Sequence, residues 1–404
     1  MPKAFGLISV FALAVVAAAA ENVETIDAKA FSGRVVSIDD KVLVLRSGAK
    51  DASVPRRQVT DVTFDRSDDL LAKIGQAVLV SHSGDLFAVS ALRLDKEHFK
   101  FTNPLLGRTQ VPMSSVVAVY MPAPTETVGD VQRRCAKLKT SATTQDTLVV
   151  AKEGKLMNVR GVLKDIAPVG GSSELKISFR WQDTDRTIAA ASVRAIVLAK
   201  APPGKAVVAG TLTACGGTHV AFTSLTLKDQ TFTVRTVSAG EKSLARKAVA
   251  SIRFIAAGAT DLSSLTPSNI KEYGFFDRTF GYKTNASVSG GPLRLAGRTY
   301  RTGLGLHSFC EITYAIDGKY SQFVTVAGID DVVRPAGNAE LVILGDGKDL
   351  CEPIHLTGKD EAKTIRLDIA GVKSLTIRVG FGADGLDVAD HVDLAAARLI
   401  KADK

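Results

Sequence analysis

A weak repeat of alternating apolar and polar residues runs from residue 21 to about residue 257, and it constrains the fold more than any other feature. Apolar residues recur at every second position on both sides of a polar turn, as in Val-Val-Ser-Ile-Asp-Asp-Lys-Val-Leu-Val-Leu at residues 35–45. Half-buried antiparallel strands require this period of two. Each unit ends in an apolar pair three residues apart, and the pairs are Val59/Val62, Val116/Val119, Val193/Ile196 and Val249/Ile252. The pattern predicts four strand-rich units that end near residues 64, 121, 199 and 255.

The four units are unequal in length, because their apolar pairs begin at residues 59, 116, 193 and 249. This argues against a propeller-like array of equal blades. One such meander cannot bury its apolar face alone, so we expect the units to pack on each other or to close into small barrels. Short helices are predicted over residues 67–74 and 128–138 as connections.

The N-terminus has the pattern of a cleavable secretory signal. Lys3 precedes an apolar run over residues 4–20, which ends in alanines just before Glu21. We expect cleavage after Ala20. An uncleaved anchor is the weaker alternative because the run is at the short end of spanning length. The mature chain is therefore expected to be secreted, or periplasmic and part of the cell envelope, with no stable membrane span.

The chain has four cysteines, an even count for the oxidising compartment that the signal predicts. They are Cys135, Cys215, Cys310 and Cys351, and their spacing excludes a zinc knuckle. Cys310 and Cys351 both fall in predicted strands of the C-terminal region, so a bridge between them is one prediction. Four buried free thiols are the alternative.

Positive charge is concentrated in the repeat region. Residues 21–260 hold 33 Lys and Arg against 23 Asp and Glu, whereas residues 261–404 hold 17 against 19. A basic half can bind an acidic polysaccharide, but these charges are scattered and form no run of the kind that binds nucleic acid. We interpret them mainly as solvated strand faces.

The last domain begins near residue 258, where the chain becomes small and polar up to Pro267. Short alternating strands follow, separated by glycine turns such as Gly318 and Gly347. Some 140 residues of this pattern suit a two-sheet sandwich. The fold class predicted for the whole chain is all-β, with repeat modules over residues 21–257 and a β-sandwich over residues 258–404.

Four short motifs in the last domain resemble those of the NPCBM family of carbohydrate-binding modules. They are Gly-Leu-Gly-Leu-His-Ser at 303–308, Gly-Ile-Asp-Asp at 328–331, Gly-Asp-Gly-Lys at 345–348 and Asp-His-Val-Asp at 390–393. The resemblance covers about residues 262–400. It implies a β-sandwich of jelly-roll or galactose-binding type that recognises carbohydrate.

This chain departs from the family where a tryptophan usually follows the last motif, because Leu394 stands there. If that ring serves core packing, a leucine can replace it. If it presents a face to sugar, the aromatic platform must come from tyrosine or phenylalanine, since the one tryptophan, Trp181, lies in the repeat region.

Candidate site residues follow from the resemblance and from the polar motifs. For carbohydrate they are Tyr300, Arg301, His307, Asp330, Asp331 and His391, with Asp390 and Asp393 beside them. A core histidine satisfied by a backbone carbonyl is the alternative for His307. The crowded carboxylates Asp384, Asp387, Asp390 and Asp393 indicate a calcium site, with a solvated acidic loop as the alternative.

The sequence predicts a non-catalytic protein. The glycine-rich 303–308 segment lacks the ending of a phosphate loop, no nucleophile elbow or His-rich metal spacing occurs, and nothing could supply eight βα units. The expected function is carbohydrate recognition by the C-terminal domain, with the repeats as a scaffold or as contacts for envelope proteins. The alternative is a structural or protein-interaction protein of the cell envelope that binds no sugar.

Overall fold

The computed structural model describes residues 21–64, 77–123, 144–199 apart from 171 and 173, 207–214, 217–256, 258–274 and 279–402. The predicted signal, both predicted helices, Cys135 and Cys215 lie outside these residues. The described residues form strands and short 3-10 turns, so the all-β prediction is confirmed. In these residues we find no helix of the length and apolarity needed to cross a membrane.

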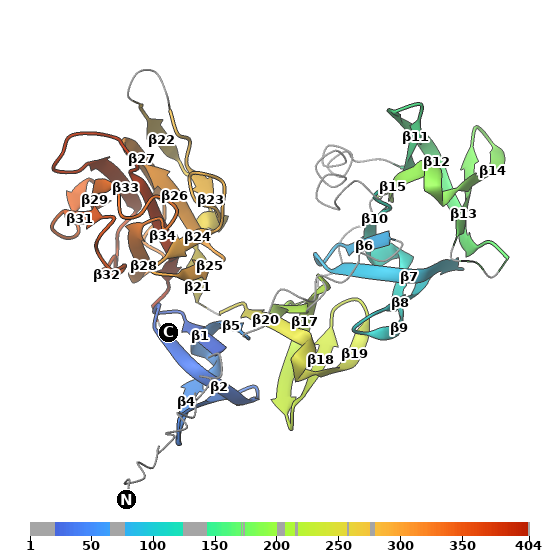
Figure 1. Cartoon of the computed structure of the whole chain (residues 1–404), viewed down its shortest axis with the longest axis horizontal. Helices are drawn as coiled ribbons and strands as arrows, with labels where there is room; N and C mark the ends of the chain where they lie inside the picture. Colours follow the sequence, from blue (N-terminus) through green and yellow to red (C-terminus); the bar gives the residue numbers. More distant parts are fainter. Residues whose placement is uncertain are drawn as a thin grey trace, which may run out of the picture.

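The repeat region consists of four five-stranded units (Figure 1). Unit 1 contains β1 (Glu21–Thr25), β2 (Ala30–Ile38), β3 (Val42–Ser47), β4 (Lys50–Pro55) and β5 (Val59–Thr63). Unit 2 contains β6 (Ala77–Ser81), β7 (Leu86–Asp95), β8 (His98–Asn103), β9 (Gly107–Pro112) and β10 (Val116–Tyr120). Unit 3 contains β11 (Asp146–Lys152), β12 (Lys155–Pro168), β13 (Leu175–Trp181), β14 (Thr184–Ala189) and β15 (Val193–Val197). Unit 4 contains β16 (Gly210–Ala214), β17 (His219–Lys228), β18 (Thr231–Thr236), β19 (Gly240–Ala245) and β20 (Val249–Phe254).

All four units have the same strand order. The first strand pairs with the second and the fifth, and the second, third and fourth follow as a meander. A 3-10 turn joins the fourth strand to the fifth, and these turns are η1 (Arg56–Gln58), η3 (Met113–Ser115), η4 (Ala190–Ser192) and η5 (Arg246–Ala248). The second strand is long and bends, so that its first half pairs with the first strand and its second half with the third. In unit 3 the bend is at Gly161, where a Cβ atom would lie 2.0 Å from the carbonyl oxygen of Arg180.

The units pair through their fifth strands, and one of the two pairs joins the first unit to the last. β5 runs antiparallel to β20, with Val62 opposite Ile252, and β10 runs antiparallel to β15, with Val119 opposite Ile196. Unit 1 is thus joined to unit 4, and unit 2 to unit 3. The apolar pairs that end each unit in the sequence lie on these four strands, and none is more than 2% exposed. Each pair therefore anchors both the core of its own unit and the seam to its partner.

The C-terminal domain is a sandwich of two antiparallel sheets. One has the order β23 (Lys283–Thr284), β26 (Gly303–His307), β34 (His391–Ile400), β28 (Gln322–Ile329) and β32 (Lys363–Asp368), with β21 (Ala259–Asp261) also paired to β34. The other has the order β22 (Asn269–Glu272), β27 (Cys310–Ala315), β33 (Ser374–Phe381), β29 (Asn338–Gly345) and β30 (Lys348–Asp349), with β31 (Ile354–Thr357) also paired to β29. A hairpin of β24 (Leu293–Leu295) and β25 (Arg298–Tyr300) packs outside the first sheet, and the turn η6 (Leu262–Ser264) precedes β22. Apolar residues of both sheets, such as Leu306 and Ile377, form one core between them.

The sandwich is fixed to units 1 and 4 by arginines. Arg398, only 2% exposed, donates to Asp61 Oδ2 at 3.2 Å, to Asp261 Oδ1 at 3.1 Å and to the Thr25 carbonyl at 3.1 Å. Arg298 forms an ion pair with Glu24 at 2.7 Å. A buried arginine with three acceptors holds the two domains in one orientation, since leaving any of these groups unpaired away from water is costly.

Cys310 and Cys351 are free thiols, so the predicted bridge between them is not formed. Cys310 begins β27, and Cys351 follows β30 in the same sheet. The strands β33 and β29 lie between them, which separates the two backbones by about 14 Å at the usual strand spacing. A disulfide needs Cα atoms within about 7 Å. Of the two free thiols, Cys310 is buried, as the alternative predicts, and Cys351 is only half-buried.

Candidate functional site

Four loops gather at the end of the sandwich that faces away from the repeat region. One loop follows β22, a second joins β26 to β27, a third follows β28 and a fourth follows β33. Antiparallel register places them together, because His307 at the end of β26 lies opposite His391 at the start of β34. Cys310 at the start of β27 likewise lies opposite Val379 near the end of β33. We call this the distal end, and in Figure 1 it lies near the label of β22, with the contact to unit 1 at the other end of the domain.

An aromatic cluster lies at the distal end. Phe280 stacks on His307 with ring centroids 4.3 Å apart, and His391 lies 5.4 Å from His307. His307 is buried, and its Nδ1 lies 2.5 Å from the Ser308 carbonyl oxygen. A carbonyl oxygen only accepts, so Nδ1 carries a hydrogen. This agrees with the core-histidine alternative for His307, which supports the surface from below.

His391 is nearer the surface than His307. Its Nδ1 lies 3.0 Å from the Ser289 hydroxyl. Burial, and then the neighbouring His307, lower the pKa of His391 below its ordinary value. The ring is therefore neutral at neutral pH and can exchange hydrogen bonds with hydroxyl groups.

Asp390 ties three loops together and is fully buried. Its Oδ2 accepts from the Ser308 hydroxyl at 2.5 Å, and its Oδ1 accepts from the backbone N–H of Asn338 at 2.9 Å. Burial raises the pKa of Asp390. With both oxygens occupied and no exposed surface, Asp390 shapes the distal end without reaching a ligand.

Asp330 and Asp393 form a second buried group beneath the same loops. Both side chains are 0% exposed. Asp393 accepts from the Arg294 amide at 3.0 Å, and Asp330 accepts from the Val332 amide at 2.7 Å. Burial, and then the charge of Asp330, raise the pKa of Asp393 to about 9. The Asp393 carboxyl group therefore keeps its proton at neutral pH.

Asp331 holds the outer hairpin. Its two oxygens accept from the backbone amides of Ala296 at 2.9 Å and Gly297 at 2.7 Å. Neither Asp330 nor Asp331 presents its carboxylate to the loops in the way that the sequence predicts for a sugar ligand. Asp330 is buried, and Asp331 uses both its oxygens within the fold.

The structure places Tyr300 and Arg301 away from the distal end. Tyr300 is buried in a small cluster with Ala28 of unit 1, beside the Arg298 guanidinium. Arg301 donates to the Ser251 hydroxyl of unit 4. These two residues belong to the contact with the repeats. The motifs of the last domain alone do not predict this contact.

The four aspartates predicted to bind calcium do not converge. Asp384 and Asp387 lie in an exposed loop, where Asp384 accepts from the Leu386 amide at 3.2 Å, while Asp390 and Asp393 are buried on separate partners. In the described part of the chain, no group of three or more His, Cys, Asp or Glu side chains is arranged to hold a metal ion. The solvated acidic loop, the alternative for Asp384 and Asp387, describes what is seen.

Exposed aromatic residues at the distal end are the feature that the sequence-based site omits. Tyr273 follows β22, Phe309 precedes β27 and Phe381 ends β33, so the three stand at the ends of neighbouring strands. Tyr273 is 61% exposed and lies 5.4 Å from Phe309, and Phe381 is 36% exposed. The signals were present in the chain, since Phe309 directly follows the 303–308 motif and Phe381 lies between two glycines.

A protein-family model matches the sequence of the last domain. The family model described as "NPCBM/NEW2 domain" matches residues 259–400. Residues 259–400 form an NPCBM/NEW2 domain. In it Leu394, at the position of the family tryptophan, is fully buried in the core of the sandwich. That position serves packing in this chain.

Three similar proteins illustrate where such sequences and shapes occur. A stretch of 114 residues, 28% of this chain, is 35% identical to a Renibacterium salmoninarum protein named "Putative endo-alpha-N-acetylgalactosaminidase", and the match spans 7% of that protein. The CBM51 of Clostridium perfringens GH95, solved in complex with methyl-galactose, covers 35% of this chain and 99% of its own at 25% identity and a TM-score of 0.32. The tandem CBM51 modules of a Streptococcus pneumoniae family 98 glycoside hydrolase cover 94% of this chain and 88% of their own at 12% identity and a TM-score of 0.31.

Proposed function

We propose that the NPCBM/NEW2 domain recognises carbohydrate at its distal end, and that the repeat units carry it as a non-catalytic scaffold in a secreted or envelope protein. The observation that carries the proposal is the aromatic edge formed by exposed Tyr273 and Phe381 and half-buried Phe309, because aromatic rings offer a flat apolar face to the C–H surface of a sugar ring. Family membership supports carbohydrate as the class of ligand.

Polar groups suited to sugar hydroxyls lie beside this edge. Neutral His391 can donate and accept, and the exposed carboxylate of Asp384 and the half-buried carboxylate of Asp387 follow Phe381 in the next loop. A small number of polar groups around an apolar surface is the usual composition of a ligand site. The buried acids Asp330, Asp390 and Asp393 keep these loops in place from below.

The repeat units support the scaffold role by their position. β34 runs ten residues from His391 at the distal end to Ile400 near units 1 and 4, a length of about 30 Å. The contact between the domains and the proposed sugar site are thus at opposite ends of one strand. A ligand can reach the distal end while the arginine contacts keep the domain attached.

The test is calorimetric titration of the mature chain, residues 21–404, with glycans ending in galactose, N-acetylglucosamine or N-acetylgalactosamine. We expect saturable binding of at least one of them. Tyr273→Ala and Phe381→Ala should each weaken it about fivefold to tenfold, since truncating a central contact residue costs more than about 1 kcal/mol.

The matched control is Met157→Ala, which removes an exposed apolar side chain from unit 3. Its affinity should equal that of the unaltered chain. No binding to any neutral or acidic glycan by the folded chain would contradict the proposal and favour the structural or protein-interaction alternative.

A further inference from the structure

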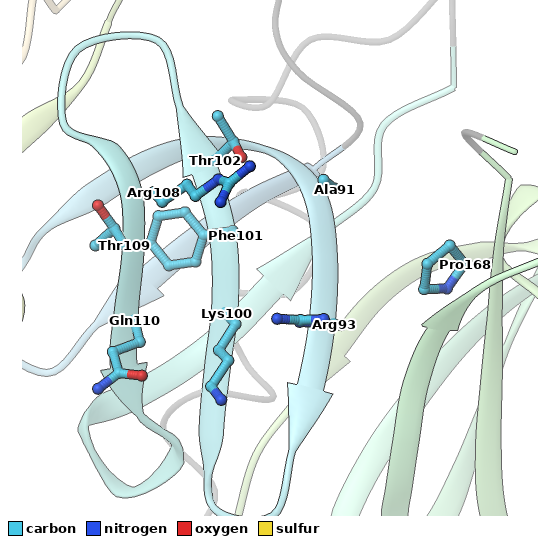
Figure 2. Close-up of a pocket in the computed structure, with 9 residues that line it drawn as sticks. All are labelled: Ala91, Arg93, Lys100, Phe101, Thr102, Arg108, Thr109, Gln110 and Pro168. Carbon is cyan, nitrogen blue, oxygen red and sulfur yellow. The ribbon is translucent and has the colours of Figure 1, made fainter. Parts of the chain in front are cut away.

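A groove of about 670 Å³ lies on unit 2, far from the distal end of the sandwich (Figure 2). Its floor is the outer face of β7, β8 and β9, and Pro168 at the end of β12 stands across from them. The residues that line it are Ala91, Arg93, Lys100, Phe101, Thr102, Arg108, Thr109, Gln110 and Pro168. Three are cations, and no carboxylate is among them.

Strand register arranges the polar side chains of this floor in two rows. Arg93 lies opposite Lys100, which lies opposite Gln110 on the far strand. Two residues along, Thr102 lies opposite Arg108. Figure 2 shows both rows on one side of the strands. Like charges directly opposite each other, such as Arg93 and Lys100, destabilise a sheet, and of these two only Lys100 has an acidic ion-pair partner, Asp95.

The nearby negative charge is already engaged. Asp95 forms an ion pair with Lys100, and this contact is the main reason that the pKa of Asp95 is lowered. Arg93 and Arg108 are exposed, and in the described part of unit 2 and its neighbours no carboxylate forms an ion pair with either. Two guanidinium groups are therefore available to an acidic ligand.

The other three units provide an internal comparison, because they share the same strand order. At the place of Thr102 and Arg108 each of them has an arginine opposite an acid. These are Arg46 and Asp51, Arg180 and Asp185, and Arg235 and Glu241. At the place of Arg93, Lys100 and Gln110 they have no cation. Among the four units, only unit 2 has no acid in the row of Thr102 and Arg108 and has cations in the adjacent row.

We propose that this groove of unit 2 binds an acidic polysaccharide, as a second site independent of the distal end. Arg93 and Arg108 stand on strands separated by β8, about 10 Å apart at the usual strand spacing. Charges so separated suit a polymer that carries repeated carboxylates better than one small anion. Thr102, Thr109 and Gln110 supply partners for the sugar hydroxyls, and the cations supply charge-assisted hydrogen bonds.

The groove lacks what a single-stranded nucleic acid requires. Binding of unstacked bases depends on exposed aromatic rings that can stack with them. The one aromatic residue of the lining, Phe101, is 4% exposed and belongs to the core of unit 2. An acidic polysaccharide needs no stacking surface here.

The experiment measures binding of the mature chain to polygalacturonate, with neutral dextran and a single-stranded oligonucleotide as comparison ligands, at low ionic strength. Arg93→Gln combined with Arg108→Gln should weaken binding to polygalacturonate about tenfold, because two charge-assisted contacts are lost. Its thermal midpoint should stay the same or rise, since opposed cations are removed. Binding should also weaken as salt is added.

The matched control is Arg46→Gln combined with Arg180→Gln, which removes the same charge from the third strands of units 1 and 3. We expect its affinity for polygalacturonate within twofold of the unaltered chain. An equal loss in both variants would mean that net charge alone attracts the polymer and would overturn the site, as would no binding to polygalacturonate or tighter binding to the oligonucleotide. Loss of neutral-sugar binding at the distal end leaves this result unchanged, so the two proposals fail separately.

Discussion

Replacing Asp393 by asparagine should remove a pH dependence of the stability of the sandwich. In the folded chain, burial and then the neighbouring Asp330 raise the pKa of Asp393 to about 9, against an ordinary value of 3.8. Between these values the folded state holds a proton that the unfolded state has released. Stability from this proton is fully present below about pH 4 and is lost as the pH rises toward about 9.

The size of the effect follows from the linkage of one proton. The free energy of unfolding should fall by about 1.4 kcal/mol for each pH unit in this window, which amounts to roughly 4 kcal/mol between pH 5 and pH 8. An asparagine cannot ionise, and it keeps an oxygen for the Arg294 amide. Its NH₂ group can donate to Asp330 Oδ2, which has no hydrogen-bond partner among the described residues. The variant should therefore gain on the unaltered chain steadily as pH rises.

Pulse proteolysis in urea at pH 5, 6, 7 and 8 measures this directly, by following the band of the C-terminal domain. Asp384→Asn is the control, because Asp384 lies in an exposed loop of the same end. Parallel curves for Asp393→Asn and the unaltered chain across this range would refute the raised pKa of Asp393.

Two further predictions concern the contact between the domains and the core. Arg398→Met should cost about 3 kcal/mol, because it leaves Asp61 buried without its cation. Arg298→Gln should cost less, because the Arg298 side chain is more exposed than that of Arg398. Urea unfolding compares the two variants, and equal costs would contradict the role of Arg398. Leu394→Trp should destabilise the sandwich by about 1–3 kcal/mol, because the buried site has no room for the larger ring. Its affinity for sugar should be unchanged. A gain in affinity would show that this position reaches the ligand.

Local patterns in the sequence account for the strands and for the four units. Alternation on both sides of a turn, as at residues 35–45, depends only on which face of a strand is buried, and the fold class follows from it. The apolar pairs such as Val119 and Ile196 mark the fifth strands for the same reason. That unit 1 joins unit 4 and unit 2 joins unit 3 depends on contacts between residues far apart in the chain, which no local pattern records.

For a related reason, the sequence predicts the location of the candidate site but not which of its side chains face solvent. Family motifs point to the end of the sandwich that holds His307 and His391, and strand register brings these two together. Whether a side chain there faces solvent depends on packing by other segments. Asp330 is sealed beneath the loops, and Arg301 is taken up by unit 4. Spacing along the chain shows neither outcome.

The predicted calcium cluster fails because closeness in sequence does not give a common direction. Asp393 lies within β34, opposite Gly305 and Gly328 on its two neighbours, and turns into the fold. Asp384 stays in the preceding exposed loop. The exposed Tyr273 and Phe381, in contrast, gain their significance only when the strand ends are seen side by side.

Amide hydrogen exchange of the mature chain, with and without the glycan that titrates, tests the central claim most directly. The account predicts protection confined to peptides that cover residues 272–274, 307–310 and 381–391, with units 1 to 4 unchanged. Protection in the repeat units, or at the contact around Arg298 and Arg398 without any at the distal end, would contradict it.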